Sequence, residues 1–124
     1  FAIAETLLNE KAVVVINGRN QEKLDKAVEK LTKKTNGSVY SITGDVTELN
    51  FPTKLLEFIK SKFGKLDVLI TNSGGPAPGA FESINDESWY KAFELSFLSH
   101  VRLIRTMLPL LRLSEQGNVL TVTS

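Results

Sequence analysis

The sequence predicts an α/β fold: a doubly wound parallel sheet with helices on both faces, in three α/β/α layers. Two observations predict this class. Apolar segments of strand length alternate, without exception, with amphipathic segments of helical length. The first strand-like segment, 12–16, is an unbroken apolar run rich in valine, which suits a strand covered on both faces of a parallel sheet. The expected order is therefore α-β-α-β-α-β-α-β.

The first two helices are defined by apolar spacing and by their ends. Ile3, Leu7 and Leu8 lie at helical spacing at the start of the chain. The second helix, 21–34, is amphipathic and ends at Asn36-Gly37, because these residue types accept the left-handed C-terminal conformation. The remaining expected strands lie at 38–43, 66–71 and 118–123.

The other two helices carry their own end signals. One ends at Gly64 and has two candidate N-caps, Thr47 and Asn50. The last, 86–113, is long, with Asn85 as its expected N-cap. Apolar residues cover more than one face of this helix, although a helix lying on one sheet face needs only one apolar stripe. The surplus predicts a partner helix.

Composition and charge exclude several classes of protein. The 124 residues include 15 Lys+Arg, 14 Asp+Glu, one His and no Cys. A net charge of +1 gives no basic face for nucleic acid, and no apolar run reaches the roughly 20 residues that cross a bilayer. Without Cys we expect no thiolate chemistry, no metal site and a reducing, cytoplasmic location. The single His100, on an apolar helix, is expected to be a structural hydrogen-bonding residue.

Ligands of open parallel sheets bind beyond the carboxyl ends of the strands. All four expected ends carry small or polar residues. Arg19 offers a fork of donors that suits phosphate, Asp45 accepts hydrogen bonds from an amine or a base edge, and Ser124 brings a hydroxyl. Taken alone, Arg19 also reads as a solvated surface residue and Asp45 as a turn residue. Their joint occurrence at successive strand ends indicates a binding site.

The ordered set of motifs resembles the short-chain dehydrogenase/reductase family across the whole chain. Gly44-Asp45-Val46-Thr47 is similar to the family's adenine-contacting Asp-Val, and segment 69–75 is similar to its Asn-Asn-Ala-Gly. Trp89 opens a helix that matches the family's long crossover. Segment 117–124 resembles the fifth strand, with Ser124 on the catalytic serine. The resemblance implies a Rossmann-like dinucleotide-binding fold.

The resemblance places Gly18 and Arg19 at the position that reads the adenosine ribose. Members that select NAD usually carry a carboxylate there, which binds the 2′-hydroxyl and would repel a 2′-phosphate. Arg19 attracts that phosphate, so we expect NADP(H) in preference to NAD. The cofactor-binding residues that the resemblance implies are Gly18, Arg19, Asp45, Val46, Asn72, Ser73 and Gly74.

The implied activity is hydride transfer between the nicotinamide and a carbonyl or secondary alcohol, as in 3-oxoacyl reductases or sugar and alcohol dehydrogenases. In the family a Tyr exchanges the proton, a Lys lowers the pKa of that Tyr, and a Ser, here Ser124, binds the substrate oxygen. A family Asn on the long helix supports a proton-relay water, and Ser96 stands in its place. With a serine in place of that asparagine, we expect the helix backbone to be less altered than it is in the family. Thr71 replaces the first Asn of the loop motif, and 75–79 is a variant loop.

The family's Gly-rich first strand and its Tyr and Lys have no counterpart in this sequence, because Tyr40 and Tyr90 stand at the wrong places. We therefore interpret residues 1–124 as a single, partial dinucleotide-binding domain, an internal segment of a longer enzyme. The missing strand would be the central one, between the expected strands 12–16 and 66–71. We expect the segment alone to fold poorly and to be inactive, because unpaired strand edges favour aggregation.

Two alternative functions were weighed against this one. A non-catalytic nucleotide-binding protein of the same fold is kept open by Ser96. An unrelated doubly wound signalling or flavin domain would show an acidic cluster or a phosphate loop at the strand ends, and neither is present. The resemblance also implies a homodimer or homotetramer through helix 86–113, with a small-molecule carbonyl or alcohol substrate and no nucleic-acid or membrane partner.

Overall fold

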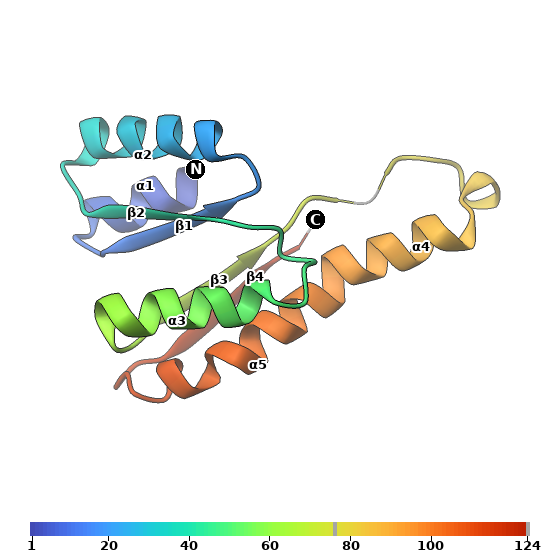
Figure 1. The fold of residues 1–124 in the computed structure, drawn as a ribbon. Coiled ribbons are helices and arrows are strands. Elements are labelled where there is room, and N and C mark those ends of the chain that lie inside the picture. Colours follow the sequence, from blue (N-terminus) through green and yellow to red (C-terminus); the bar gives the residue numbers. More distant parts are fainter. Residues whose placement is uncertain (76, 124) are drawn as a thin grey trace. The chain divides into compact units, whose positions relative to one another are not determined.

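The computed structural model describes residues 1–75 and 77–123. It has the α/β architecture that the sequence predicts, with parallel strands and flanking helices (Figure 1). Two compact units, Phe1–Asp45 and Val46–Ser124, divide the chain, and each is described by itself. The elements of the first unit are α1 (Ala2–Asn9), β1 (Val14–Gly18), α2 (Gln21–Thr35) and β2 (Val39–Thr43). Those of the second are α3 (Phe51–Phe63), β3 (Val68–Asn72), η1 (Phe81–Ser83), α4 (Asp86–Phe93), the π-helical turn η2 (Glu94–Leu98), α5 (Ser99–Leu111) and β4 (Asn118–Val122).

The first unit is a parallel strand pair with two helices. β1 and β2 run in register from Val14 opposite Val39 to Gly18 opposite Thr43. Both α1 and α2 pack on β1. Their apolar faces form the core of this unit, and Leu31 of α2 is fully buried there. The buried members of this core are Ala4, Leu8, Val14 and Leu31.

β1 begins and ends two residues later than the expected strand 12–16. The cause lies at the end of α1, where Lys11 adopts a left-handed conformation with φ of +68°. The backbone N–H of Ala12 then donates to the carbonyl of Leu7, so this residue closes the helix and does not start the strand. At the other end, Asn17 Nδ2 donates to the carbonyl of Ile42 at 3.0 Å, which holds this polar residue in the strand.

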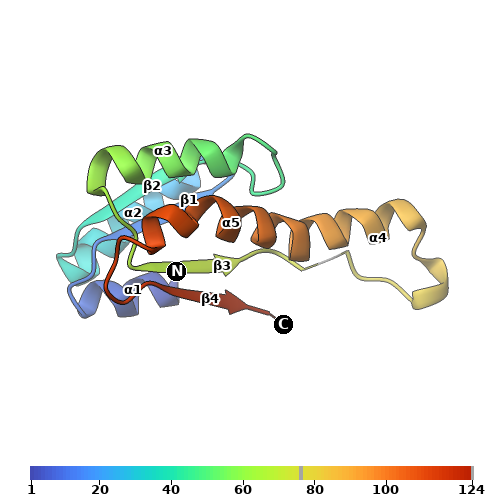
Figure 2. The same cartoon turned by 90° about the horizontal axis from the view of Figure 1, so that it is seen from below.

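The second unit also contains one parallel strand pair. β3 and β4 run in register from Val68 opposite Asn118 to Asn72 opposite Val122. α5 contacts both α3 and β3, and Figure 2 shows these elements running along one another. Met107 of α5 is fully buried. Among residues 1–75 and 77–123, β1 pairs with β2, β3 pairs with β4, and no ladder joins the two pairs.

Several helix ends are as expected. Gly64 closes α3 with φ of +74°, and Asn36 closes α2 with φ of +50°. The Asn85 side chain accepts a hydrogen bond from the backbone N–H of Ser88 at 3.0 Å, which confirms it as the N-cap of α4. Asn50 stands at the N-cap position of α3, as one of the two candidates predicted, but its side chain makes no capping hydrogen bond.

The long helix differs most from expectation. It is not one regular α-helix over 86–113, because five residues form a π-helical turn between α4 and α5, and α5 ends at Leu111. The helix backbone around Ser96 is therefore strongly altered, contrary to our expectation for a serine at that position. Within the described parts of the chain, no helix is long and apolar enough to cross a membrane.

Candidate functional site

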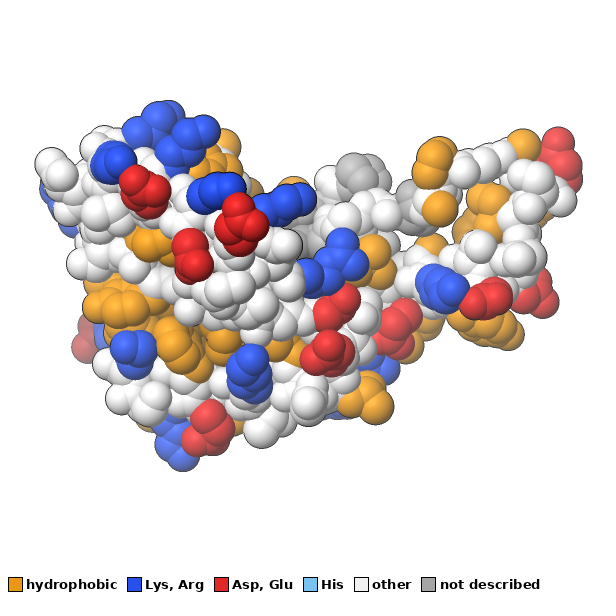
Figure 3. All heavy atoms as spheres, turned by 45° about the horizontal axis from the view of Figure 1, so that its top comes forward, with side chains coloured by type: hydrophobic (Ala, Val, Ile, Leu, Met, Phe, Trp, Pro, Cys, Tyr) orange, Lys and Arg blue, Asp and Glu red, His pale blue; other side chains and the backbone are white. Residues whose placement is uncertain are grey.

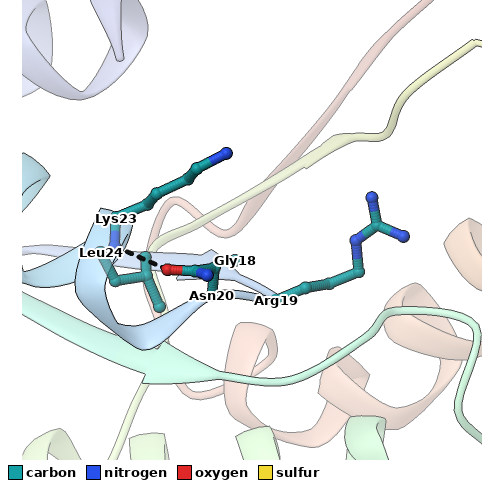
Figure 4. A pocket seen from close by; sticks show the side chains of 5 residues that line it. All are labelled: Gly18, Arg19, Asn20, Lys23 and Leu24. Atoms are coloured by element: carbon teal, nitrogen blue, oxygen red, sulfur yellow. Dashed lines mark hydrogen bonds between the residues drawn. The ribbon is translucent and has the colours of Figure 1, made fainter.

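The carboxyl end of β1 forms an open pocket of about 290 Å³. Its lining comes from the end of the strand and the first turn of α2: Gly18, Arg19, Asn20, Lys23 and Leu24 (Figure 4). The Asn20 side chain accepts from the backbone N–H of Lys23 at 2.9 Å and so caps α2. This cap fixes the direction in which the helix leaves the strand. The first turn of α2 therefore faces the same strand end as Arg19.

Gly18 is packed closely against Leu24 of α2. A methyl group built on its Cα would lie 3.3 Å from Leu24 Cγ and Cδ2, which is tighter than an ordinary contact. The absence of a side chain lets α2 approach the end of the strand. The carbonyl of Gly18 also accepts a hydrogen bond from the backbone N–H of Gly44 at 3.0 Å, which joins the ends of β1 and β2.

Arg19 and Asp45, both predicted from the sequence, are brought together in the first unit. Arg19 Nη1 lies 3.8 Å from Asp45 Oδ2, and the Arg19 side chain is 81% exposed. At that separation and exposure the pair contributes little free energy, because solvent screens it. The guanidinium therefore remains available to an anion in the pocket.

Lys23 was missed by the sequence reasoning. It lies in the first turn of α2, and its side chain lines the same pocket as Arg19 (Figure 4). Among the residues that the structure describes, its ammonium makes no ion pair, whereas Lys26 and Lys33 on the same helix pair with Glu22 and Glu29. The signal was available: a basic residue three positions after an N-cap lies beside the strand end that precedes the helix.

The carboxyl end of β3, in the second unit, is held by side-chain hydrogen bonds. Thr71 is buried, and its hydroxyl lies 3.0 Å from the hydroxyl of Thr121 on β4. The residue that departs from the family motif therefore cross-links the two strands. Two positions further on, Ser73 Oγ lies 3.2 Å from Nε2 of His100 on α5. His100 is buried, and this contact agrees with its expected structural role.

Ser96 lies in the π-helical turn and is exposed. Hydrogen bonds of Ser99 and an ion pair of Glu94 stabilise the π-helical turn. The backbone N–H of Ser99 reaches back five residues to the carbonyl of Glu94, and its hydroxyl donates to the carbonyl of Leu95 at 2.6 Å. Arg102 binds both carboxylate oxygens of Glu94 across the turn. π-helical turns of this kind are frequent at functional sites.

The remaining predicted residues lie on or near exposed loops. Val46 follows the first unit, while Asn72 and Gly74 are exposed at the end of β3. Space is open around Gly74, since a built Cβ there meets no atom within 4 Å. Ser124 lies outside the described residues, as does Pro76 of the variant loop. Over the described ranges, no three His, Cys, Asp or Glu side chains gather as a metal site would require.

Comparison with known proteins decides the family. All residues, 1–124, match the family model described as short chain dehydrogenase. The chain belongs to the short-chain dehydrogenase family. This confirms the resemblance inferred from the strand-end motifs, and the family is one of oxidoreductases.

Several proteins that are similar to this short-chain dehydrogenase chain are longer than it. Dehydrogenase/reductase SDR family member 4 from Caenorhabditis elegans is 37% identical over 110 residues, covering 88% of this chain and 42% of that protein. The crystal structure of YwfH, an NADPH-dependent reductase involved in bacilysin biosynthesis, has a TM-score of 0.91 and 28% identity, covering 99% and 51%. L-sorbose reductase from Gluconobacter frateurii, complexed with NADPH and L-sorbose, has a TM-score of 0.90 and 29% identity, covering 97% and 46%. The chain spans about half the length of these relatives.

Proposed function

We propose that this short-chain dehydrogenase chain is the NADP(H)-binding part of an oxidoreductase that acts on a carbonyl or a secondary alcohol. The observation that carries the proposal is the pocket at the end of β1, which is lined by two basic side chains, Arg19 and Lys23, and by no carboxylate. A binding site with that charge favours the 2′-phosphate of NADP(H) over the 2′-hydroxyl of NAD(H).

The geometry is suited to a phosphate. Arg19 can present two parallel N–H donors to phosphate oxygens, and Lys23 adds a point charge from the other rim of the pocket. The negative charge of the neighbouring Asp45 does not cancel the positive charge of Arg19, because the ion pair between them is long and solvated. Two similar solved proteins are described as NADPH-dependent or as complexed with NADPH, which supports the same preference.

The proposed chemistry uses few groups of this chain. When bound, the nicotinamide supplies or accepts the hydride. Asn72, Ser73 and Gly74 hold the cofactor beyond β3, and Asp45 and Val46 contact the adenine. Ser96 holds a water in the π-helical turn for proton relay, and Ser124 donates a hydrogen bond to the substrate oxygen. By the family resemblance, no residue of 1–124 stands at the place of the proton-exchanging Tyr and its Lys, so we expect these residues alone to be inactive. The substrate class is that of 3-oxoacyl, sugar or simple alcohol substrates.

Replacement of Arg19 in the whole protein tests the cofactor assignment. Arg19→Ala removes a charge-assisted contact to the 2′-phosphate, so the dissociation constant for NADPH should rise about 10- to 100-fold. The constant for NADH should stay within about twofold, because NADH has no group at that position. Arg112→Ala, an exposed arginine after α5, is the matched control. Titration by nucleotide fluorescence gives each constant, and equal losses for both nucleotides would refute the assignment.

A second candidate is a nucleotide-binding protein of the same fold without catalysis. Ser96, in place of the family's Asn, favours it. The two candidates differ in one measurement: a binding protein takes up NADPH but oxidises none of it in the presence of ketone, sugar and 3-oxoacyl substrates.

The proposal includes self-association in the cytoplasm. Apolar side chains are exposed along α4 and the π-helical turn, and Figure 3 shows such groups, in orange, around α4 at the right of the view. Phe93 and Phe97 stack on each other at 5.0 Å between ring centroids, and Phe81 meets Trp89 edge-on at 6.0 Å. This face suits a second copy of the chain, as a homodimer or within a homotetramer. The mass of the protein in solution tests it.

A further inference from the structure

We infer that His100 is a positioning residue, which holds the loop after β3 in its cofactor-binding conformation through Ser73. The inference rests on the proposed function, since that function assigns Asn72, Ser73 and Gly74 to the cofactor. The direct observation is the hydrogen bond between His100 Nε2 and Ser73 Oγ at 3.2 Å, made by an imidazole that is only 7% exposed.

The loop has little else to hold it. Gly74 and Gly75 have open space on the side where a Cβ would stand, and Asn72 and Gly74 are exposed. Within the described part of the chain, no other side-chain hydrogen bond is made by residues 72–75. Ser73 is half-buried and is therefore the anchor of this loop. A glycine-rich loop without an anchor loses more conformational entropy on binding a ligand.

The coupling between loop and helix follows from burial. A buried imidazole nitrogen without a partner costs free energy, and in the described residues Ser73 is the side chain that serves His100. If the loop moves away, the ring loses that partner. His100 lies among buried residues of α5, next to Ser99 and three positions before Leu103, so it cannot readily turn to solvent. The helix therefore penalises displacement of the loop.

The π-helical turn explains why the imidazole faces the loop. A π turn inserts one extra residue into the helix, which rotates every later side chain by about 100° relative to an unbroken α-helix. His100 comes two residues after the turn ends at Leu98. The Ser99 hydroxyl and the Glu94–Arg102 ion pair stabilise the turn and thereby set the direction of His100. This gives the π-helical turn a second role, independent of any water held by Ser96.

The test uses three variants of the protein as its gene encodes it. His100→Met fills the space without a hydrogen-bonding nitrogen, His100→Gln keeps a polar group at the position of Nε2, and Ser73→Ala removes the hydroxyl from the loop. Loss of one buried hydrogen bond should weaken NADPH binding about 5- to 10-fold in His100→Met and in Ser73→Ala. The double variant should be no weaker than either single one, and His100→Gln should stay within about twofold of the parent.

Two further readouts separate positioning from a merely structural role. NADPH and NADH should lose affinity equally, because the loop is not part of the 2′-phosphate pocket. Amide hydrogen exchange of residues 73–75 should quicken in His100→Met and Ser73→Ala but not in His100→Gln. Ser73→Ala keeps the test usable if His100→Met does not fold, since it leaves the helix core untouched.

The outcomes are distinguishable. Additive losses in the double variant, or weak binding in Ser73→Ala with normal binding in His100→Met, would overturn the inference, because Ser73 would then act on the ligand independently of His100. A parent protein that binds neither NADPH nor NADH would instead refute the proposed function. The exchange measurement then still decides whether His100 holds the loop.

Discussion

The ends of β1 and β3 carry similar small and polar residues, yet the structure builds them in opposite ways. At the end of β1 the two basic side chains that line the pocket, Arg19 and Lys23, are exposed, and Arg19 forms a long ion pair with Asp45. At the end of β3 the buried Thr71 hydrogen-bonds to Thr121, and Ser73 hydrogen-bonds to the buried His100. One end offers charge, whereas the other is fixed by partly buried hydrogen bonds.

This difference separates two ways of binding a nucleotide. Exposed basic side chains attract a phosphate over a distance and lose strength as salt screens them. Buried hydrogen bonds add no attraction, but they reduce the entropy that a loop loses when the ligand orders it. Substitutions at the end of β1 should therefore change selectivity and salt dependence. Substitutions at the end of β3 should change affinity for both nucleotides alike.

The largest expected effects come from the cores beneath the two sites. Leu31 in the first unit and Met107 in the second are fully buried. Truncation of either to Ala leaves a cavity and should lower the free energy of unfolding by about 2–5 kcal/mol. Denaturant titration measures this, and hydrogen exchange should show the greatest loss of protection in 14–18 for Leu31→Ala and in 68–72 for Met107→Ala. A loss below about 1 kcal/mol would show that the cores relax around the cavity.

A smaller effect is expected at the second basic residue of the pocket. Lys23→Gln should weaken NADPH binding about 3- to 10-fold and make it less dependent on salt, because one positive charge is lost. Lys26→Gln is the control, since Lys26 pairs with Glu22 at 2.5 Å and does not line the pocket. The effect of Ser73→Ala should be the same at low and at high salt. A strong salt dependence in Ser73→Ala would remove the contrast between the two strand ends.

The sequence was sufficient for features that depend on local patterns. The alternating strand and helix segments and the caps at Asn85 and Gly64 follow from apolar spacing and short motifs. The ends of β1 did not follow, because the left-handed Lys11 and the side chain of Asn17 shift the strand by two residues. The conformation of Lys11 is rare, and the side chain of Asn17 depends on a partner that is distant along the chain.

The site was predicted less completely than the fold. Arg19 and Asp45 were proposed because they lie at strand ends, whereas Lys23 lies inside a helix whose polar face is typical of a solvated surface. The π-helical turn escaped prediction because Ser99 and the Glu94–Arg102 pair, not Ser96, account for it. The partner of His100 could not be predicted, because Ser73 is 27 residues away along the chain.

The smallest expected effect lies at the opposite end of β3, at Asp67. The Ser114 hydroxyl donates to its carboxylate at 2.5 Å and Lys65 lies 3.0 Å away, and together they hold the pKa of Asp67 below its ordinary value. The charged form is therefore favoured in the folded state. Its contribution to stability is present above the unfolded-state pKa and is lost as the pH falls through the lowered one.

Ser114→Ala should raise the pKa of Asp67 toward its ordinary value, and Ser114→Thr, which keeps the hydroxyl, should not. The carboxylate resonance of Asp67 followed against pH measures this directly. Because the Asp67 side chain is 58% exposed, the loss of stability at neutral pH should be at most a few tenths of a kcal/mol. NADPH affinity should not change, since Asp67 lies at the amino end of β3, away from the carboxyl end that carries Ser73. A change in affinity in Ser114→Ala would mean that the strand transmits the loss along its length, and the binding site could then no longer be assigned to the carboxyl ends alone.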